Sequence, residues 1–146
     1  MTDVLYVEDN PDEADVFARL MRRQARPIRY EILDSGTSAI RYLYGSGPDE
    51  KTPQPVPRLI LMDLNLNGMS GFDIVERIRT DERTRTVPIV AFSTSDNPSD
   101  IDRAYRLGVN AYLVKPGGYQ STHELLDRTF TFWLDTNNLP QPQLGR

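Results

Sequence analysis

The sequence contains no cysteine, one histidine and only two lysines among its 146 residues. Without cysteine there can be no disulfide bond, no thiolate metal site and no cysteine nucleophile, and this composition suits a reducing compartment. The cytoplasm is therefore the expected location. No stretch approaches the roughly 18 apolar residues of a membrane span, and the first residues lack the basic and apolar regions of a signal peptide. We expect a soluble, unprocessed protein that makes no contact with a membrane.

The chain has no excess of positive charge, since 21 acidic residues outnumber 17 lysines and arginines, the formal net charge is −4 and the isoelectric point is about 5.0. Proteins that bind nucleic acid usually carry a basic stripe, so DNA and RNA are not expected partners. A chain of 146 residues fits one domain and can bury most of its apolar surface.

The most informative stretch is the apolar run 59–62, which is followed at once by Asp63. Pro57 precedes the run and a turn-rich segment, 65–71, follows it, so the pattern predicts a buried strand. In open parallel sheets, ligands bind beyond the carboxyl ends of the strands, and Asp63 would project into such a crevice. The plainer alternative is that Asp63 caps a turn.

Strand and helix patterns alternate along the rest of the chain. We predict strands at 4–7, 28–33, 59–62, 87–92 and 111–116, and helices at 11–21, 35–44, 71–80, 98–107 and 121–135. Asn10-Pro11 and Asn97-Pro98 are typical helix starts, and Ser121 to Glu124 has the spacing of a capping box. The proline-rich segment 45–57 is predicted to be a solvated loop. Five strand–helix units imply an α/β fold, a parallel sheet covered by helices on both faces.

Polar side chains follow four of the five predicted strands. They are Glu8 and Asp9 after the first strand, Asp63 after the third, Ser93 after the fourth and Lys115 at the end of the fifth. Three carboxylates gathered in one crevice repel one another unless a cation lies between them. Oxygen ligands, with no cysteine or histidine at these positions, favour Mg²⁺ over zinc or a fully enclosed calcium ion.

This constellation resembles the signature of bacterial response-regulator receiver domains. Asp63 and Ser93 are 30 residues apart, and 22 residues separate Ser93 from Lys115, which Pro116 follows. The resemblance covers residues 3 to about 135. It implies a flavodoxin-like, doubly wound, five-stranded parallel sheet of order 2-1-3-4-5, in a signalling protein that accepts a phosphoryl group from a histidine kinase. Magnesium-dependent self-phosphorylation and slow self-dephosphorylation would be its only chemistry.

Two features narrow the resemblance to the stand-alone regulators that are paired with bacterial phytochromes. They are the proline-rich loop and the sequence Phe132-Trp-Leu-Asp-Thr, with Leu139-Pro140 beyond it. A bacteriophytochrome kinase is accordingly the expected phosphodonor. Because no residues remain for an appended output domain, we expect the protein to signal by binding a partner after a conformational change, or to act as a phosphate sink.

The resemblance also assigns roles at the strand ends. Asp63 would be the phosphoacceptor, and Mg²⁺ would be held by Glu8, Asp9, Asp63 and the backbone carbonyl of Asn65. A simpler interpretation of Glu8 and Asp9 is that their negative charges stabilise the N-terminus of the following helix.

Three further residues receive roles in the same way. Lys115 would pair with Asp63 and then with the phosphoryl oxygens, and Ser93 would donate its hydroxyl to the phosphoryl group. Tyr112 would be the switch aromatic that turns inward with Ser93, although its position also suits an ordinary amphipathic strand residue. His123 is expected to be an exposed surface residue, and no role as a phosphodonor is assigned to it.

The last helix carries two apolar stripes, of which only one can face the sheet. The stripes are Leu126, Phe130, Trp133 and Leu134, and Leu125 with Phe132. We therefore expect a homodimer that forms through this helix and its neighbours. Residues 1–135 would form the receiver domain. Residues 136–146 would form a proline-containing tail, either disordered or in contact with the second subunit.

The sequence departs from the receiver pattern at two places. Gly117-Gly118 stands where a phenylalanine is common after the Lys-Pro pair, which would leave a packing position unfilled, and Ser93 replaces a more common threonine. Two alternatives stay open. An aspartyl-phosphate phosphatase of the haloacid dehalogenase type wants a second aspartate at position 65, which is asparagine, and an interaction module that has lost phosphorylation would not need the constellation.

Overall fold

The computed structural model describes residues 2–45 and 53–140, and its core is a five-stranded parallel sheet. The strand order is β2-β1-β3-β4-β5, which confirms the predicted flavodoxin-like fold. The strands are β1 Val4–Val7, β2 Tyr30–Leu33, β3 Leu59–Met62, β4 Ile89–Ser93 and β5 Ala111–Val114.

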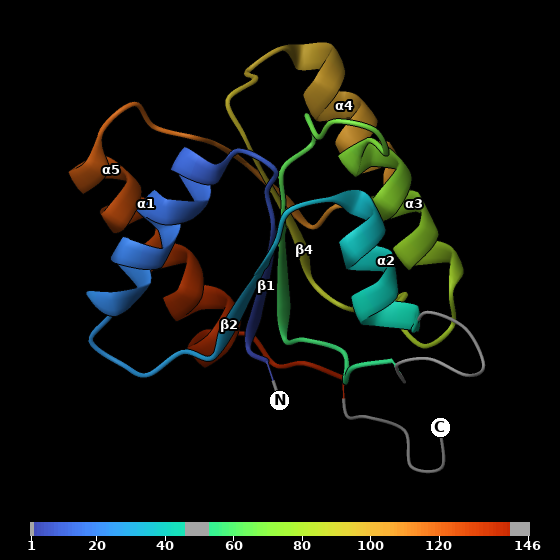
Figure 1. Ribbon diagram of the computed structural model, residues 1–146, viewed down its shortest axis with the longest axis horizontal. Coiled ribbons are helices and arrows are strands. Elements are labelled where there is room, and N and C mark those ends of the chain that lie inside the picture. The colour runs from blue at the N-terminus through green and yellow to red at the C-terminus, as the bar shows by residue number, and fades with distance from the viewer. Residues whose placement is uncertain (1, 46–52, 141–146) are drawn as a thin grey trace.

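Five α-helices cover the two faces of this sheet, with α1 and α5 on one face and α2, α3 and α4 on the other (Figure 1). The helices are α1 Pro11–Arg22, α2 Gly36–Tyr44, α3 Gly71–Thr80, α4 Pro98–Leu107 and α5 Tyr119–Phe130, and a π-helical segment, Thr131–Thr136, follows α5. Among the residues that the structure describes, no helix is long and apolar enough to span a membrane.

The central strands are apolar throughout because both of their faces are buried. Leu5 and Val7 of β1 belong to the core under α2 and α3, whereas Val4 and Tyr6 belong to the core under α1 and α5. Successive side chains of a strand point to opposite faces, so a strand covered on both sides needs a continuous apolar run. The run Leu59–Met62 in β3 has the same origin, and all four residues are buried.

Most of the helices begin at the predicted positions, where N-cap side chains bind the first turn. The side chain of Asn10 accepts hydrogen bonds from the first turn of α1, and Asn97 and Ser35 cap α4 and α2 in the same way. Gly108 ends α4 with a φ of 117°, a left-handed conformation that glycine adopts without steric cost.

The start of the last helix was predicted wrongly. Gly118 is its N-cap residue and α5 begins at Tyr119, so Ser121 lies inside the first turn and no capping box forms there. Its hydroxyl donates instead to the carbonyl of Gly118, at 3.0 Å. The extended conformation of Gly118, with ψ of 153°, lets the helix begin directly after the strand-end turn. The helical segment also ends differently from the prediction, as a π-helix from Thr131.

Strand β2 and the segment 45–57 also differ in extent from what the sequence predicted or lie partly outside the described residues. Strand β2 begins at Tyr30 and not at residue 28, because Pro27 and Ile28 precede its first pairing with β1. In the predicted loop 45–57, residues 46–52 lie outside the described part of the chain, and residues 53–57 form neither helix nor strand.

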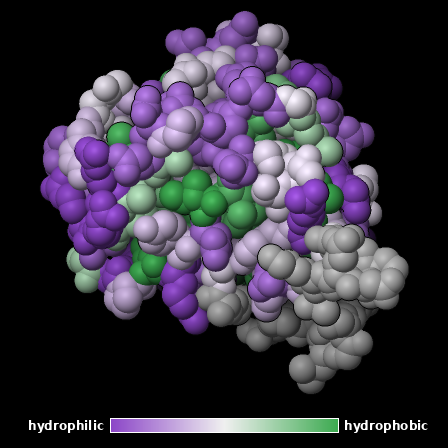
Figure 2. Space-filling model, viewed as in Figure 1, coloured by the Kyte–Doolittle hydropathy of each residue, from purple (hydrophilic) through white to green (hydrophobic). Residues whose placement is uncertain are grey.

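The edge strand β2 leaves an apolar area on the surface. Figure 2 shows hydrophobic residues gathered on this face over β2, between the hydrophilic surfaces of α1 and α2. Tyr30, Ile32 and Leu33 are each half-buried, and Glu31 is exposed.

Glycine at position 71 allows α3 to approach the end of β3. A Cβ atom added to Gly71 would lie 2.3 Å from the carbonyl oxygen of Asp63 and 2.7 Å from the Cα atom of Leu64, whereas one added to Gly117 would meet nothing within 4 Å. Backbone atoms cannot yield as a flexible side chain can, so the two glycines differ in what they tolerate.

We predict that Gly71→Ala lowers the free energy of unfolding by about 2 kcal/mol or more, as overpacking does. The matched variant Gly117→Ala should leave it unchanged or raise it by less than about 1 kcal/mol, through the unfolded state. Urea denaturation of the two variants tests this difference. Equal stabilities would show that α3 can move away from Asp63 at no cost.

Candidate functional site

The sheet brings the ends of four strands, β1, β3, β4 and β5, to one edge. Residues Val7 and Met62 are paired in register between β1 and β3, so Glu8 and Asp63 follow neighbouring strand ends. The backbone amide of Asp63 donates to the carbonyl of Val7 at 3.1 Å, and the amide of Lys115 donates to the carbonyl of Ser93 at 2.7 Å. Strand pairing therefore fixes the backbone from which each polar side chain leaves.

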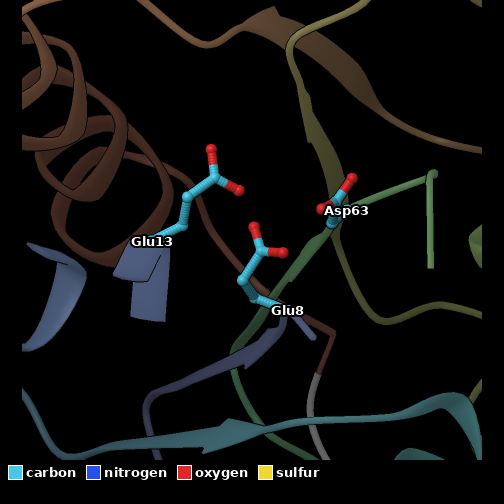
Figure 3. Close-up of side chains that lie close together, drawn as sticks. All are labelled: Glu8, Glu13 and Asp63. Carbon is cyan, nitrogen blue, oxygen red and sulfur yellow. The ribbon is translucent and has the colours of Figure 1, made fainter. Parts of the chain in front are cut away.

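Three carboxylates converge at this edge. Oxygen atoms of Glu8, Glu13 and Asp63 lie within 4.8 Å of one another, and Figure 3 shows their side chains turned toward a common space from β1, α1 and β3. The ammonium group of Lys115 lies among them, 2.5 Å from Glu8, 2.9 Å from Glu13 and 3.5 Å from Asp63. When all four groups are charged, two negative charges remain uncompensated.

These charges are mostly shielded from water. The side chains of Glu8, Asp63 and Lys115 are 0%, 8% and 8% exposed, and only that of Glu13 is more open, at 38%. Removing one partner from a buried ion pair leaves the other charge without compensation, which is strongly destabilising. Charge as well as packing therefore holds Lys115 among these acids.

Glu8 accepts hydrogen bonds on both carboxylate oxygens. Its Oε1 atom accepts from the Tyr6 hydroxyl at 2.8 Å and from Lys115 at 2.5 Å. Its Oε2 atom accepts from the backbone amide of Asn10 at 3.2 Å. A buried carboxylate needs such donors to offset its lost hydration, and here they also tie β1, α1 and β5 together.

The surroundings shift three pKa values. Burial alone would lower the pKa of Lys115, but hydrogen bonds to Glu8 and Glu13 and the charge of Asp63 outweigh it and raise that pKa. Burial, followed by the charge and hydrogen bond of Glu8, raises the pKa of the Tyr6 hydroxyl far above its usual range. Burial, together with the nearby Glu8, also raises the pKa of Glu13, although Lys115 opposes this shift.

A second group of polar contacts surrounds Asp63 and leads away from it. The backbone amide of Asn65 donates to Asp63 Oδ1 at 3.0 Å, and the Asn65 side chain donates to the hydroxyl of Ser93 at 3.4 Å. The Ser93 hydroxyl also accepts from the amide of Ser95 at 3.2 Å. Tyr112 then donates its hydroxyl to the carbonyl of Ser95 at 2.8 Å. A continuous set of hydrogen bonds thus connects Asp63 with Tyr112.

Asp9 is not one of the three converging acids. Its Oδ2 atom accepts a hydrogen bond from the backbone amide of Asn67, at 2.8 Å, in the segment that follows β3. Asp9 therefore holds the β3–α3 connection beside the site. The proposed role of the Asn65 carbonyl as a metal ligand stays a prediction.

The donor set suits a hard divalent cation. Carboxylate oxygens are the ligands that Mg²⁺ prefers, and the excess of negative charge described above favours a cation over an anion. Among the described residues, the acids that could share an ion are Glu8, Glu13 and Asp63, so the structure adds Glu13 to the residues predicted from the sequence.

Glu13 is the residue that the sequence interpretation missed. It stands three positions after the N-cap Asn10, where a glutamate commonly reaches back to the N-cap amide, so a structural role was the ordinary expectation for it. A weak signal was present, because Glu13 lies in the first turn of the helix that begins directly after Glu8 and Asp9.

The expectation that His123 is exposed was wrong. It is half-buried, and its Nδ1 atom is buried with no hydrogen-bond partner among the described residues. Because α5 begins at Tyr119 and not at Ser121, His123 lies deeper in the helix than the sequence pattern indicated.

A cavity of about 270 Å³ lies beside the acids, between α1 and the start of α5. Gly117 and Gly118 line it, together with Glu13, Lys115 and apolar residues that include Phe17. The packing position that a larger residue at 117 would fill is thus open in this protein, as expected from the two glycines.

Comparison with known proteins gives one consistent result. The family model for the response regulator receiver domain matches residues 4–127. The chain is 33% identical over 142 residues to the probable methanogenesis regulatory protein FilR2 of Methanothrix harundinacea, a match that covers 95% of this chain and 88% of FilR2. It is 30% identical over 137 residues to the response regulator Rcp1 of Synechocystis, covering 94% of this chain and 92% of Rcp1.

The solved structures agree. The Mn²⁺-bound form of Rcp1 superposes with a TM-score of 0.83 at 29% identity, covering 97% of this chain and 100% of that chain. The phosphorylated cyanobacterial phytochrome response regulator RcpA superposes with a TM-score of 0.83 at 28% identity, with the same coverage. The narrower resemblance to phytochrome response regulators is thereby confirmed.

We predict that the contribution of Tyr6 to stability disappears in alkaline solution. The folded protein keeps the Tyr6 proton because its pKa is raised, whereas the unfolded chain releases it above about pH 10. The folded state then binds more protons, so its stability falls by about 1.4 kcal/mol per pH unit in that range. Urea denaturation from pH 8 to 11 should show the wild type losing its advantage over Tyr6→Phe. A constant difference between them would contradict the prediction.

Proposed function

The chain belongs to the response regulator receiver domain family, and from that premise we propose that Asp63 accepts a phosphoryl group from a histidine kinase. Receiver domains are phosphoacceptor signalling modules and not classical enzymes. They receive their phosphoryl groups from histidine kinases and bind a divalent metal at an acidic site. The phosphorelay role therefore rests on family membership, and the residue roles rest on the geometry of this site.

The observation that carries the proposal is the place of Asp63 opposite Lys115. The carboxylate lies at the end of β3, it is 8% exposed, and its Oδ2 atom lies 3.5 Å from Lys115 Nζ. In the proposed step, a carboxylate oxygen attacks the phosphorus of a phosphohistidine, and the P–N bond breaks with its electron pair left on the imidazole nitrogen. The product is an acyl phosphate on Asp63.

The surrounding residues would stabilise the charge on the transferring group. Lys115 places an ammonium next to the position that the phosphoryl oxygens would occupy. Such preorganised charge stabilises negative charge strongly in a site with little water. We propose Mg²⁺ as the metal, held by Glu8, Asp9 and Asp63 with the backbone carbonyl of Asn65. When bound, the ion would neutralise negative charge on the phosphoryl oxygens.

Ser93 and Tyr112 would transmit the phosphorylation of Asp63 to the β4–α4 connection and β5. The Ser93 hydroxyl is buried and now meets Asn65 and Ser95, so a phosphoryl oxygen that recruits this hydroxyl would displace those partners. The carbonyl of Ser95 accepts from Tyr112, and a shift of the β4–α4 connection would alter that bond. We infer that Ser93 and Tyr112 form the switch.

A bacteriophytochrome kinase is the proposed phosphodonor, acting in the cytoplasm. The support is the similarity to RcpA, which is a phytochrome response regulator, and to Rcp1 over 94% of this chain. Neither alternative function is favoured. The family match argues against a haloacid dehalogenase phosphatase, and the buried Asp63 and Lys115 argue against a module that has lost phosphorylation.

The proposed homodimer involves the end of the last helical segment. Leu126, Phe130 and Leu134 are buried against the sheet, whereas Phe132 is 49% exposed. The ring of Phe132 packs edge-on against Trp133, with centroids 5.0 Å apart, which forms an aromatic pair at the surface.

We propose a receiver domain at 1–135 and a tail at 136–146; residues 141–146 lie outside the described part of the chain.

Incubation with acetyl phosphate and Mg²⁺ should add one phosphoryl group to the wild type, and Asp63→Asn should abolish this gain because it removes the nucleophile. Intact mass spectrometry measures both. Asp15→Asn is the control, since that carboxylate is 58% exposed and pairs with Arg19. Labelling of Asp63→Asn at the wild-type level would refute the assignment. A phosphorylated bacteriophytochrome kinase, used as the donor in a parallel reaction, tests the partner separately.

Phe132→Glu should shift the protein from dimer to monomer, because a charge would be buried in the proposed apolar contact. Light scattering coupled to size-exclusion chromatography measures the mass. Tyr105→Glu provides the control, since Tyr105 is equally exposed, at 49%, but lies on α4 on the opposite face of the sheet. A dimer that survives Phe132→Glu would exclude the last helix as the contact.

A further inference from the structure

Glu13 makes a contact that the proposed phosphoryl transfer does not require. Its Oε2 atom lies 2.9 Å from Lys115 Nζ, and its carboxylate reaches the site from α1, not from a strand end (Figure 3). The Lys115 ammonium is therefore shared between two glutamates and one aspartate.

The usual helix-capping role of such a glutamate is already filled. A glutamate three residues after the N-cap commonly accepts from the N-cap amide. Here the amide of Asn10 donates to Glu8 Oε2 at 3.2 Å, and the Asn10 side chain accepts from the amides of Asp12 and Glu13 at 2.9 and 3.3 Å. The Glu13 side chain therefore takes no part in the helix cap, and it accepts a hydrogen bond from Lys115 instead.

The distances show which acids hold the ammonium. Lys115 Nζ is within hydrogen-bond range of Glu8 and Glu13, at 2.5 and 2.9 Å, but it is 3.5 Å from Asp63. The ammonium has three N–H donors, and two of them are used on Glu8 and Glu13. A group on Asp63 that draws Nζ toward itself therefore competes with these two contacts. Glu8 is buried and bonded to Tyr6 and Asn10, so its position is fixed.

Glu13 has room to give way. Its side chain is 38% exposed, and it lines the cavity of about 270 Å³ that Gly117 and Gly118 leave open between α1 and α5. A Cβ atom added to Gly117 would meet nothing within 4 Å. The Glu13 carboxylate can turn into this space or into solvent without displacing another side chain.

We propose that Glu13 is a positioning residue that holds Lys115 Nζ away from Asp63 and so opposes phosphorylation of the site. The proposal rests on the function proposed above. A phosphoryl group on Asp63 competes with Glu13 for the Lys115 ammonium, so the Glu13 contact favours the unphosphorylated protein. Couplings of this kind change affinity by about 5- to 150-fold, and the exposure of Glu13 places the effect at the low end.

Beryllofluoride with Mg²⁺ is a suitable probe because it forms a phosphoryl-like adduct with a carboxylate. Titrations followed by ¹⁹F NMR should show that Glu13→Gln binds it about fivefold more tightly than the wild type. Glu13→Asp keeps the charge but shortens the side chain away from Lys115, and it should bind more tightly as well. Asp12→Asn removes a neighbouring exposed charge that is not among the three acids in contact with Lys115, and it should match the wild type within about twofold.

A second measurement reports the contact itself. The chain has only two lysines, Lys51 and Lys115, so side-chain NMR of ¹⁵N-lysine-labelled protein gives two ammonium signals. Both Glu13 variants should shift the Lys115 signal and leave that of Lys51 unchanged. This readout needs no phosphoryl analogue, so it tests the contact even if the wild type fails to bind beryllofluoride, a result that would count against the proposed function instead.

Three results would overturn the inference. An unchanged Lys115 signal in both variants would show that Glu13 does not hold the ammonium. Wild-type affinity in both variants would show that the contact does not oppose the adduct. Tighter binding in Glu13→Gln but not in Glu13→Asp would assign the effect to negative charge and not to the position of Lys115.

Discussion

The structure depends on one buried ammonium among three carboxylates. Lys115 reaches Glu8, Glu13 and Asp63 from β5, across the end of the sheet. The three acids come from β1, α1 and β3, so the lysine links α1 by charge to the paired strands β1 and β3. A charge set of this kind is costly to bury. The proposed phosphoryl transfer gives this charge set a function, because the ammonium lies 3.5 Å from the proposed phosphoacceptor Asp63.

The parallel sheet makes this arrangement possible. Strands that run in the same direction end at the same edge, and the β1–β3 register places the residues after Val7 and Met62 next to each other. Gly71 then lets α3 pack tightly against the backbone of Asp63. The proposed phosphoacceptor Asp63 therefore lies at a strand end, whereas Glu13 lies in the first turn of α1, which borders an open cavity. Lys115 thus has one acidic partner at the end of a strand, Asp63, and another on a helix beside open space, Glu13.

The hydrogen bonds that lead from Asp63 through Asn65, Ser93 and Ser95 to Tyr112 lie on the other side of the acid. A change at Asp63 can thus act in two directions, through Lys115 toward α1 and through Ser93 toward β5. Both routes consist of polar contacts with discrete partners, and such contacts can switch between alternatives more readily than a close-packed core can deform.

The sequence by itself determined the order of strands and helices, most helix starts and the residues after each strand, because periodicity, N-caps and strand-end polarity are local signals. It also indicated Asp63, Lys115 and Ser93 through their spacing. Only the tertiary structure showed that Asp9 accepts a hydrogen bond from Asn67 and that Glu13 lies beside Glu8 and Asp63, since the distance between side chains on a helix and on a distant strand is not encoded locally. The start of α5 at Tyr119 and the half-buried His123 were likewise set by packing and by the Gly118 turn, which a capping-box pattern could not reveal.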